Sequence, residues 1–205
     1  MFNQFLEKTI VKSQRCQRNW DLTKTVREED VKTLATSITK CSSKQNRVFY
    51  KAHFITNREM IEKIYDETEG FMINFETREC KKNPQVLANL LVAFTEDEDN
   101  ELRTTPERDS GRKDADPQRF KDRDVAIGIA AGYLTYTANL LGYSTGCCQC
   151  FMAKPVQEIL GSEGKPLLLM GIGYPNKTKN RRIDQTDEDF TFPSFSKEIE
   201  VEYIS

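Results

Sequence analysis

The sequence predicts a single domain of the α+β or α/β class. Its 205 residues match one large domain and are enough to bury a substantial core. Stretches with helical spacing of apolar residues are interspersed with short apolar runs that are typical of strands. Because helices and strands follow one another in a mixed order, both classes stay open at this level.

The first third of the chain predicts three helices and one strand. Residues 2–12 carry apolar side chains at helical spacing, and a second amphipathic stretch begins at a capping-box pattern in residues 25–28. A loop of small polar residues at 41–46 separates this helix from residues 48–55, which alternate as a strand does. A further capping box at residues 56–59 opens the third helix.

The central element is a long helix predicted at residues 125–142. This stretch is nearly free of charge and apolar around most of its circumference, so we expect it to be buried on all sides. Gly128 and Gly132 leave room for a neighbouring backbone, and Gly142 ends the helix. The helix leads into a short segment rich in cysteine, where we expect the functional site.

The remaining elements alternate between apolar runs and polar connections. Residues 87–95 and 167–173 are short apolar runs that predict buried strands, and residues 155–160 predict a short helix. The tail at 197–204 alternates glutamate with apolar residues, as in an edge strand with one wet face. Residues 70–84 are ambiguous. Residues 96–123 are dominated by charged side chains and predict a solvated excursion or a lid within the single domain 1–205.

Composition excludes several classes of protein. The formal net charge of -2 gives no reason to expect nucleic acid or a membrane as a partner. The N-terminal residues lack an apolar leader, and six cysteines without one predict free thiols in a cytoplasmic protein. The single histidine, His53, argues against a multi-histidine metal site and a histidine-based triad.

Two groups of cations far apart in sequence are candidates for a phosphate site. Arg15 and Arg18 follow the first helix, and the second group, near the end of the chain, consists of Lys179, Arg181 and Arg182. Guanidinium forks suit phosphate, and no glycine-rich phosphate loop is present, so side chains would have to hold the anion. The alternative is that both groups are ordinary surface charge.

The cysteine-rich segment allows three interpretations. Cys147, Cys148 and Cys150 could bind a metal, form a redox pair or simply be small buried thiols that line a pocket, and the spacing favours the last. Ser42 and Ser43 lie in the polar loop after the second helix. By themselves they indicate no more than a polar turn.

Four segments, in their order, resemble the FMN-dependent nitroreductase family. Residues 14–20, Gln-Arg-Cys-Gln-Arg-Asn-Trp, are similar to the family motif Arg-Arg-Ser-x-Arg-x-Phe. Residues 42–47, Ser-Ser-Lys-Gln-Asn-Arg, are similar to the Ser-Ser-x-Asn-x-Gln loop. The central helix ending in Leu-Gly with the segment 147–151, and the strand, Gly-Tyr-Pro turn and basic loop in 167–182, complete the resemblance.

The resemblance implies an α+β fold, with a mixed or antiparallel sheet surrounded by helices, in an intertwined homodimer that binds FMN at the subunit interface. It implies NAD(P)H-driven ping-pong reduction of nitroaromatic, quinone or related small acceptors, with the flavin and no side chain carrying the chemistry. The residues it assigns to the cofactor are Arg15, Cys16, Arg18, Ser42, Ser43, Asn46, Cys148, Gln149, Cys150, Lys179, Arg181 and Arg182. Of these, Ser42, Ser43 and Asn46 would come from the other subunit.

The chain departs from the family motifs at several of these positions. Gln14 stands at the first arginine, Cys16 at the serine, and cysteines occupy the segment beside the flavin. Two alternatives therefore accompany the enzyme hypothesis. One is a flavin-binding homodimer of the same fold with little or no turnover, and the other is a cysteine-based redox or metal-binding protein.

Overall fold

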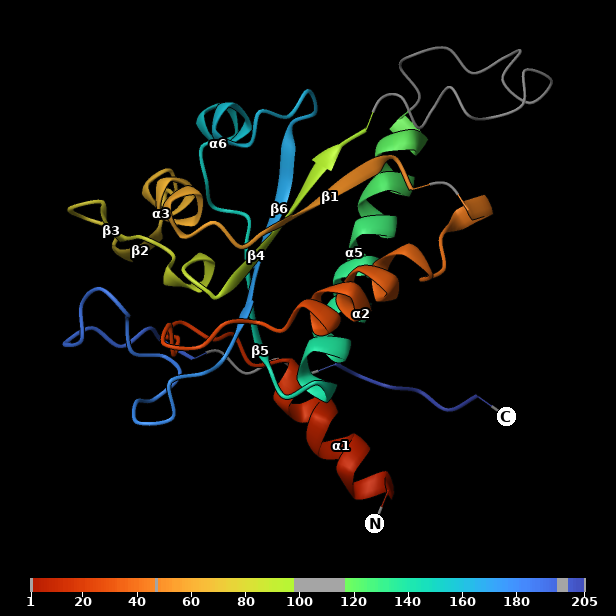
Figure 1. Cartoon of the computed structure of the whole chain (residues 1–205), viewed down its shortest axis with the longest axis horizontal. Helices are drawn as coiled ribbons and strands as arrows, with labels where there is room; N and C mark the ends of the chain where they lie inside the picture. The colour runs from red at the N-terminus through yellow and green to blue at the C-terminus, as the bar shows by residue number, and fades with distance from the viewer. Residues whose placement is uncertain (1, 47, 98–116, 195–198, 205) are drawn as a thin grey trace.

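The fold is built on a four-stranded antiparallel sheet with helices on both faces (Figure 1). The computed structural model describes residues 2–46, 48–97, 117–194 and 199–204. The strands, in their order across the sheet, are β1 (Tyr50–Ile55), β4 (Leu90–Glu96), β6 (Pro166–Gly173) and β5 (Ser144–Cys148). The helices are α1 (Phe2–Ser13), α2 (Glu28–Thr39), α3 (Arg58–Asp66), α5 (Pro117–Leu140) and α6 (Ala153–Leu160), with short 3-10 turns η1 (Lys44–Asn46) and η2 (Pro84–Val86).

The two central strands are apolar because both of their faces are covered. Leu90, Val92 and Phe94 of β4 pack with α2 and α5, whereas Leu91 and Ala93, which point the other way, pack with α3 and α6. Figure 1 shows these helix pairs on opposite sides of the sheet. The α+β class and the helix-covered antiparallel sheet expected from the resemblance are therefore confirmed.

The long helix α5 is buried on one face only. Ala126, Ala130, Leu134 and Ala138 form a buried stripe at four-residue spacing, but Tyr133 on the other face is 50% exposed. The prediction of burial on all sides is wrong for the single chain, because only one face meets the sheet layer. The helix also begins earlier than predicted, so that residues 117–123 of the charged stretch are helical.

The glycines of α5 do not serve a close approach within the chain. A Cβ added at Gly128 or Gly132 would meet no atom within 4 Å, so that prediction is also wrong for the single chain. Gly142 does end the helix, with a φ of +92° that suits glycine and a bond from the Tyr143 amide to the Ala138 carbonyl at 2.9 Å. No helix within the described residues combines the length and apolar character needed to cross a membrane.

Both predicted capping boxes are wrong in detail. Arg27 is the N-cap residue of α2 and provides no side-chain cap, so Thr25 does not play that role. The first turn of α2 is instead acidic, which stabilises the positive end of a helix dipole. At α3 the cap is Asn57, whose side chain accepts a hydrogen bond from the Met60 amide at 2.9 Å.

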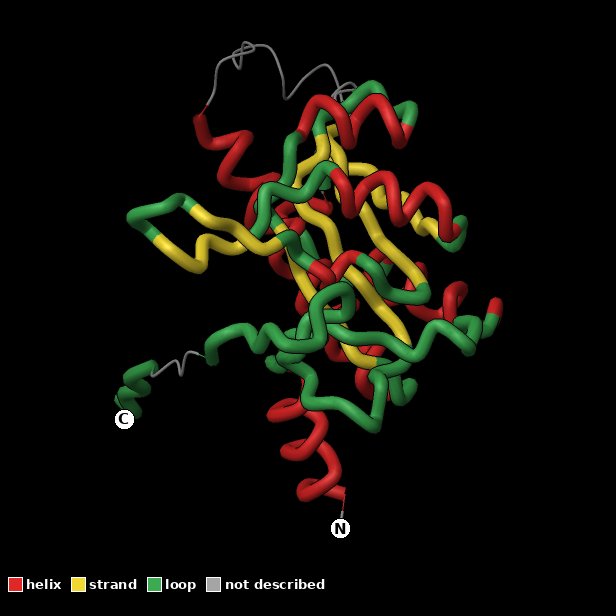
Figure 2. Tube along the Cα trace, turned by 90° about the vertical axis from the view of Figure 1, so that its left-hand side faces the viewer, coloured by secondary structure: helices red, strands yellow, loops and turns green. Residues whose placement is uncertain are grey.

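One terminal segment differs from expectation, and the structure resolves one ambiguous segment. Residues 199–204 form no strand, so the predicted edge strand is wrong for the single chain, where these residues lie exposed beyond the body of the molecule (Figure 2). The ambiguous residues 70–84 contain a hairpin of β2 (Phe71–Asn74) and β3 (Glu79–Lys81), which projects from the body. Of the predicted excursion or lid at 96–123, residues 98–116 lie outside the described part.

Candidate functional site

The segment after α1 runs between the sheet and the segment that follows β6. Cys16 forms a parallel bridge with Thr145 at the start of β5, and the Gln17 amide donates to the Thr145 carbonyl at 2.9 Å. Trp20 forms an antiparallel bridge with Pro175. The two ends of the sequence that carry the candidate cations are therefore neighbours in the fold.

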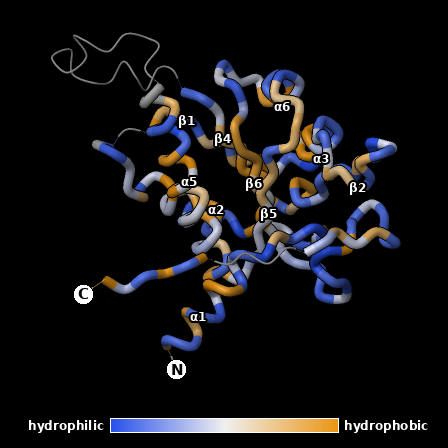
Figure 3. Tube along the Cα trace, turned by 180° about the vertical axis from the view of Figure 1, so that it is seen from behind, coloured by the Kyte–Doolittle hydropathy of each residue, from blue (hydrophilic) through white to orange (hydrophobic). Residues whose placement is uncertain are grey.

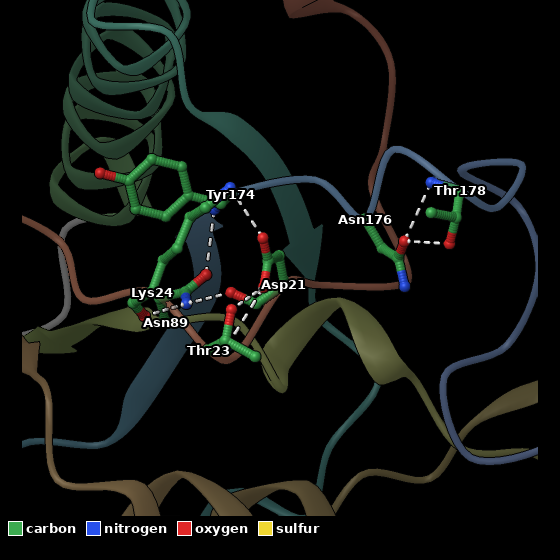
Figure 4. Close-up of polar contacts among 7 residues, drawn as sticks. All are labelled: Asp21, Thr23, Lys24, Asn89, Tyr174, Asn176 and Thr178. Carbon is green, nitrogen blue, oxygen red and sulfur yellow. Dashed lines mark hydrogen bonds and ion pairs between the residues drawn. The ribbon is translucent and has the colours of Figure 1, made fainter.

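A polar cluster around Asn89 fixes this arrangement (Figure 4). The Asn89 side-chain amide donates to the carbonyls of Asp21 and Lys24, at 2.9 and 2.8 Å, and its oxygen accepts from the Tyr174 amide at 3.0 Å. Gly173 makes room for it, since a Cβ there would lie 2.0 Å from the Asn89 oxygen. One side chain, directly before β4, thus contacts both cation-bearing segments.

Asn19 makes a second connection between the two segments, close to the candidate cations. Its buried side-chain amide donates to the carbonyls of Asn180 and Ile183 at 2.6 and 3.1 Å. Beside it, the Arg18 amide donates to the Arg181 carbonyl at 3.1 Å. These bonds place Arg18 and Arg181 side by side, although 163 positions separate them (181 − 18).

We call Arg15, Arg18, Arg181 and Arg182 the arginine cluster. Burial lowers the pKa of Arg181, and the positive charges of Arg18, Arg15 and Arg182 lower it further, so the four groups share one electrostatic environment. Arg181 donates to the Cys16 carbonyl at 3.1 Å, and the Nε of Arg18 is buried without a hydrogen-bond partner in the described structure. Such a site favours an anion.

Lys179 is placed differently from the arginines. Its ammonium group pairs with the carboxylate of Glu188, so part of its charge is already compensated. We therefore expect a smaller contribution from Lys179 than from the four arginines.

Phe192 contacts two members of the arginine cluster and was not predicted from the sequence. The Arg18 guanidinium lies over its ring, 4.6 Å from the centroid, and Arg182 donates to its carbonyl at 3.2 Å. Phe190, Phe192 and Phe195 lie among polar residues near the end of the chain, and nothing in that pattern singles out Phe192 for such a role.

A cavity of about 170 Å³ adjoins the arginine cluster. It is lined by Ser13, Gln14, Arg15, Cys16, Thr135, Thr145, Gly146 and Cys147. Gly146 is required by its surroundings, since a Cβ there would lie 2.5 Å from the Cβ of Gln85 and 2.8 Å from the Gln17 carbonyl oxygen. The cavity is smaller than the roughly 300–1,000 Å³ of typical cofactor and ligand sites.

The cysteine segment forms the outer end of β5 and the turn after it. Cys148 is buried, its sulfur accepts from the Asn83 amide at 3.4 Å, and burial raises the pKa of its thiol to about 12. Cys147 and Cys150 are exposed in the single chain, as is Gln149. Of the three expected thiols, only Cys148 is therefore buried, and Cys147 lines the cavity. No three side chains of the described residues are grouped to hold a metal.

Ser42, Ser43 and Asn46 lie far from the arginine cluster within one chain. The η1 turn beside them is tied to the start of α5 by the ion pair of Lys44 and Asp122 at 2.7 Å. The cavity instead contacts α5 at Thr135. A helix rises about 1.5 Å per residue, so roughly 20 Å of α5 separates the two places.

Comparisons with known proteins agree with this architecture. A sequence model described as the nitroreductase family matches residues 11–174. A nitroreductase family protein of Streptococcus pneumoniae superposes with a TM-score of 0.67 at 19% identity, over 97% of this chain and 100% of that one. The NfrA1 nitroreductase of B. subtilis gives 0.68 at 16% identity, over 88% of this chain and 71% of that one.

A third solved structure is named for a proposed NAD(P)H:FMN oxidoreductase of Staphylococcus epidermidis. It superposes with a TM-score of 0.59 at 17% identity, over 85% of this chain and 89% of that one. No curated protein sequence matches. At such low identities the structural similarity shows only the fold. The match to the family sequence model, in contrast, covers most of the chain. This chain belongs to the nitroreductase family.

Proposed function

We propose that this protein is an FMN-dependent oxidoreductase. In a ping-pong reaction, NADH or NADPH would reduce the bound flavin, which would then reduce a nitroaromatic, a quinone or a related small acceptor. Membership of the nitroreductase family supports the class of reaction, and the name of the staphylococcal structure supports FMN and a reduced nicotinamide. The flavin supplies the hydride chemistry, so the protein needs no acid–base pair of its own.

The arginine cluster is the observation that carries the proposal. Arg15, Arg18, Arg181 and Arg182 come from both ends of the chain. The Arg18 amide donates to the Arg181 carbonyl, Arg18 and Arg182 both contact Phe192, and the charges of the other three arginines lower the pKa of Arg181. Gathering like charges is unfavourable unless an anion compensates them, and the unpartnered Nε of Arg18 is a donor that such an anion can use. The donor set therefore fits the phosphate of FMN.

The cysteine segment fits the reactive edge of the flavin ring. Two of its carbonyls accept hydrogen bonds from other segments. The Gln85 side-chain amide donates to the Cys147 carbonyl at 3.0 Å, and the Glu69 amide donates to the Cys150 carbonyl at 3.0 Å. The amides of Gln149 and Cys150 form no hydrogen bond with other described residues. We propose that this segment, Cys148 to Cys150, presents backbone donors that orient the ring and tune its electron affinity.

We further propose that the active form is a homodimer. Figure 3 shows hydrophobic residues in α1 and in the C-terminal segment, both of which extend from the body of the chain. Phe2 of α1, Val125 of α5 and Tyr203 of the tail are 71%, 60% and 94% exposed. Surfaces of this kind mark interaction sites. The partner would cover them, enlarge the small cavity, and bring its Ser42, Ser43 and Asn46 to the flavin.

Spectroscopy of the purified protein tests the proposal. Apo protein titrated with FMN should gain a tightly bound flavin spectrum, which NADH or NADPH should bleach anaerobically and a nitroaromatic or quinone should restore. A flavin that binds but resists bleaching by either nucleotide would identify a binding protein with little turnover. Bound metal without flavin affinity would contradict the proposal and favour a cysteine-based metal protein.

A further inference from the structure

We propose that Phe192 is a positioning residue of the phosphate site, which holds two guanidinium groups from opposite ends of the chain toward one anion. The inference rests on the proposed FMN site, and it assigns to the segment after β6 a role in selecting phosphorylated flavin over riboflavin. Phe192 lies beyond the 11–174 region that the family model matches.

Phe192 contacts the two arginines through different groups. Its ring lies under the Arg18 guanidinium at 4.6 Å, and its carbonyl accepts from Arg182 Nη1 at 3.2 Å. A contact with the ring face uses none of the in-plane N–H donors of Arg18, and Arg182 gives up only one of its five. Both forks are therefore oriented while most of their donors stay available to an anion.

Phe192 is itself held rigidly, as a positioning residue must be. Its side chain is 1% exposed, and its amide donates to the Arg182 carbonyl at 3.0 Å. The rings of Phe71 and Phe190 pack edge-on against it, at centroid distances of 6.0 and 4.9 Å. The hairpin and the C-terminal segment thus fix the surface on which Arg18 rests.

These side chains need to be held in place because their like charges repel one another. The charges of Arg15, Arg18 and Arg182 oppose that of Arg181, and long arginine side chains lose substantial rotamer freedom when they converge. Without the aromatic surface, Arg18 can turn toward solvent and away from its like-charged neighbours. The ring therefore holds in place, before the ligand arrives, a conformation that the phosphate would otherwise have to impose.

The test compares the affinities of FMN and riboflavin for apo protein, measured by quenching of flavin fluorescence. Phe192→Leu should reduce the preference for FMN about 3- to 30-fold, since a desolvated cation–π contact carries that order of effect. Riboflavin, which lacks the phosphate, serves as the internal reference for any general loosening of the fold. Phe192→Tyr keeps the aromatic face and should retain most of the preference.

Phe190→Leu is the matched control, because it removes a ring from the same cluster that lies against Lys81 and, within the described structure, against no arginine. Because Phe190 supports Phe192 and leaves the ring under Arg18 in place, Phe190→Leu should lower the FMN preference by less than Phe192→Leu does. If Phe192→Leu does not fold, Phe192→Met fills the same space with a flexible side chain and no ring, and it should show the same loss.

Two results overturn the inference, and Arg18→Ala separates them. If Arg18→Ala loses the FMN preference and the ring-deleting variants keep it, the phosphate site stands and the role of Phe192 is refuted. If Arg18→Ala itself keeps the parental preference, the phosphate does not bind at the arginine cluster and the proposed FMN site fails with it.

Discussion

Replacement of Arg18 and Arg182 by alanine, singly and together, probes the phosphate site from both ends of the chain. The two side chains are 164 positions apart in sequence (182 − 18), yet both contact Phe192. In the proposed site each donates to the same phosphate. Removing either one should therefore weaken FMN binding and leave riboflavin binding nearly unchanged.

The size of the effect follows from the donors that each arginine has free. A hydrogen bond that involves a charged group contributes about 1.5–3 kcal/mol, which corresponds to roughly ten- to a hundredfold in affinity. Arg18 should lie at the upper end of this range, because its Nε is buried without a partner. Arg182 already donates to Phe192 and should lie nearer the lower end.

Flavin fluorescence titration of the apo variants measures both affinities directly. The double variant should lose less than the sum of the two single losses in free energy, because the residues share one partner. Lys179→Ala is the internal control, since its ammonium group is paired with Glu188 and its loss should cost FMN binding less. Single variants that bind FMN like the parent, or lose riboflavin equally, would refute the phosphate assignment and leave two unrelated surface patches.

Four further predictions follow from other parts of the structure. Sedimentation should show a dimer at low micromolar concentration, and a stable folded monomer would contradict the homodimer proposal. Replacing Cys147, Cys148 and Cys150 together by serine or alanine should leave FMN bound and part of the reductase activity intact, whereas a flavin-loaded but inactive protein would count against a packing role. Asn89→Ala removes three hydrogen bonds, two of them half-buried and one exposed, and should lower the free energy of unfolding by about 2–4 kcal/mol in denaturant titration. Burial raises the pKa of Asp30, but hydrogen bonds from Tyr143 and Arg27 and the charge of Arg27 lower it below its usual value. The stabilisation from Asp30 is therefore complete above about pH 4 and fades as pH falls through the folded pKa. Asp30→Asn should make the free energy of unfolding depend less on pH in this acid range.

The central strands could be predicted because burial on both faces leaves a strong sequence signal. The apolar runs of β4 and β6 read as strands, although β4 begins at Leu90 and not at the predicted residue 87. β5 could not be recognised, because Ser144, Gly146 and the cysteines have no marked strand preference. Its pairing with β6 makes it a strand, and that pairing is a tertiary effect.

The errors over α5 and the tail share one physical cause. Sequence patterns report which faces are apolar, and they do not report whether the chain itself or another copy covers them. The exposed face of α5 at Tyr133 and the exposed tail at Ile199 carry the patterns of buried elements. The homodimer proposal would account for both.

Part of the candidate site could be predicted from the sequence and part could not. Arginine pairs at both ends of the sequence could be noticed. The structure brings Arg18, Arg181 and Arg182 together, and the charge of Arg15 also lowers the pKa of Arg181. The sequence gives no indication of Phe192, because a cation–π contact depends on placement in space and has no fixed spacing. Ser43 stays remote from this cluster in one chain, so its role depends on the partner.

Anaerobic titration of the FMN-loaded protein with NADH and NADPH tests the central claim most directly. We expect that apo protein binds FMN in preference to riboflavin, that one or both nucleotides bleach the bound flavin, and that a quinone or nitroaromatic restores its absorbance. Apo protein that shows no preference for FMN over riboflavin, or a bound flavin that neither nucleotide reduces, would contradict it.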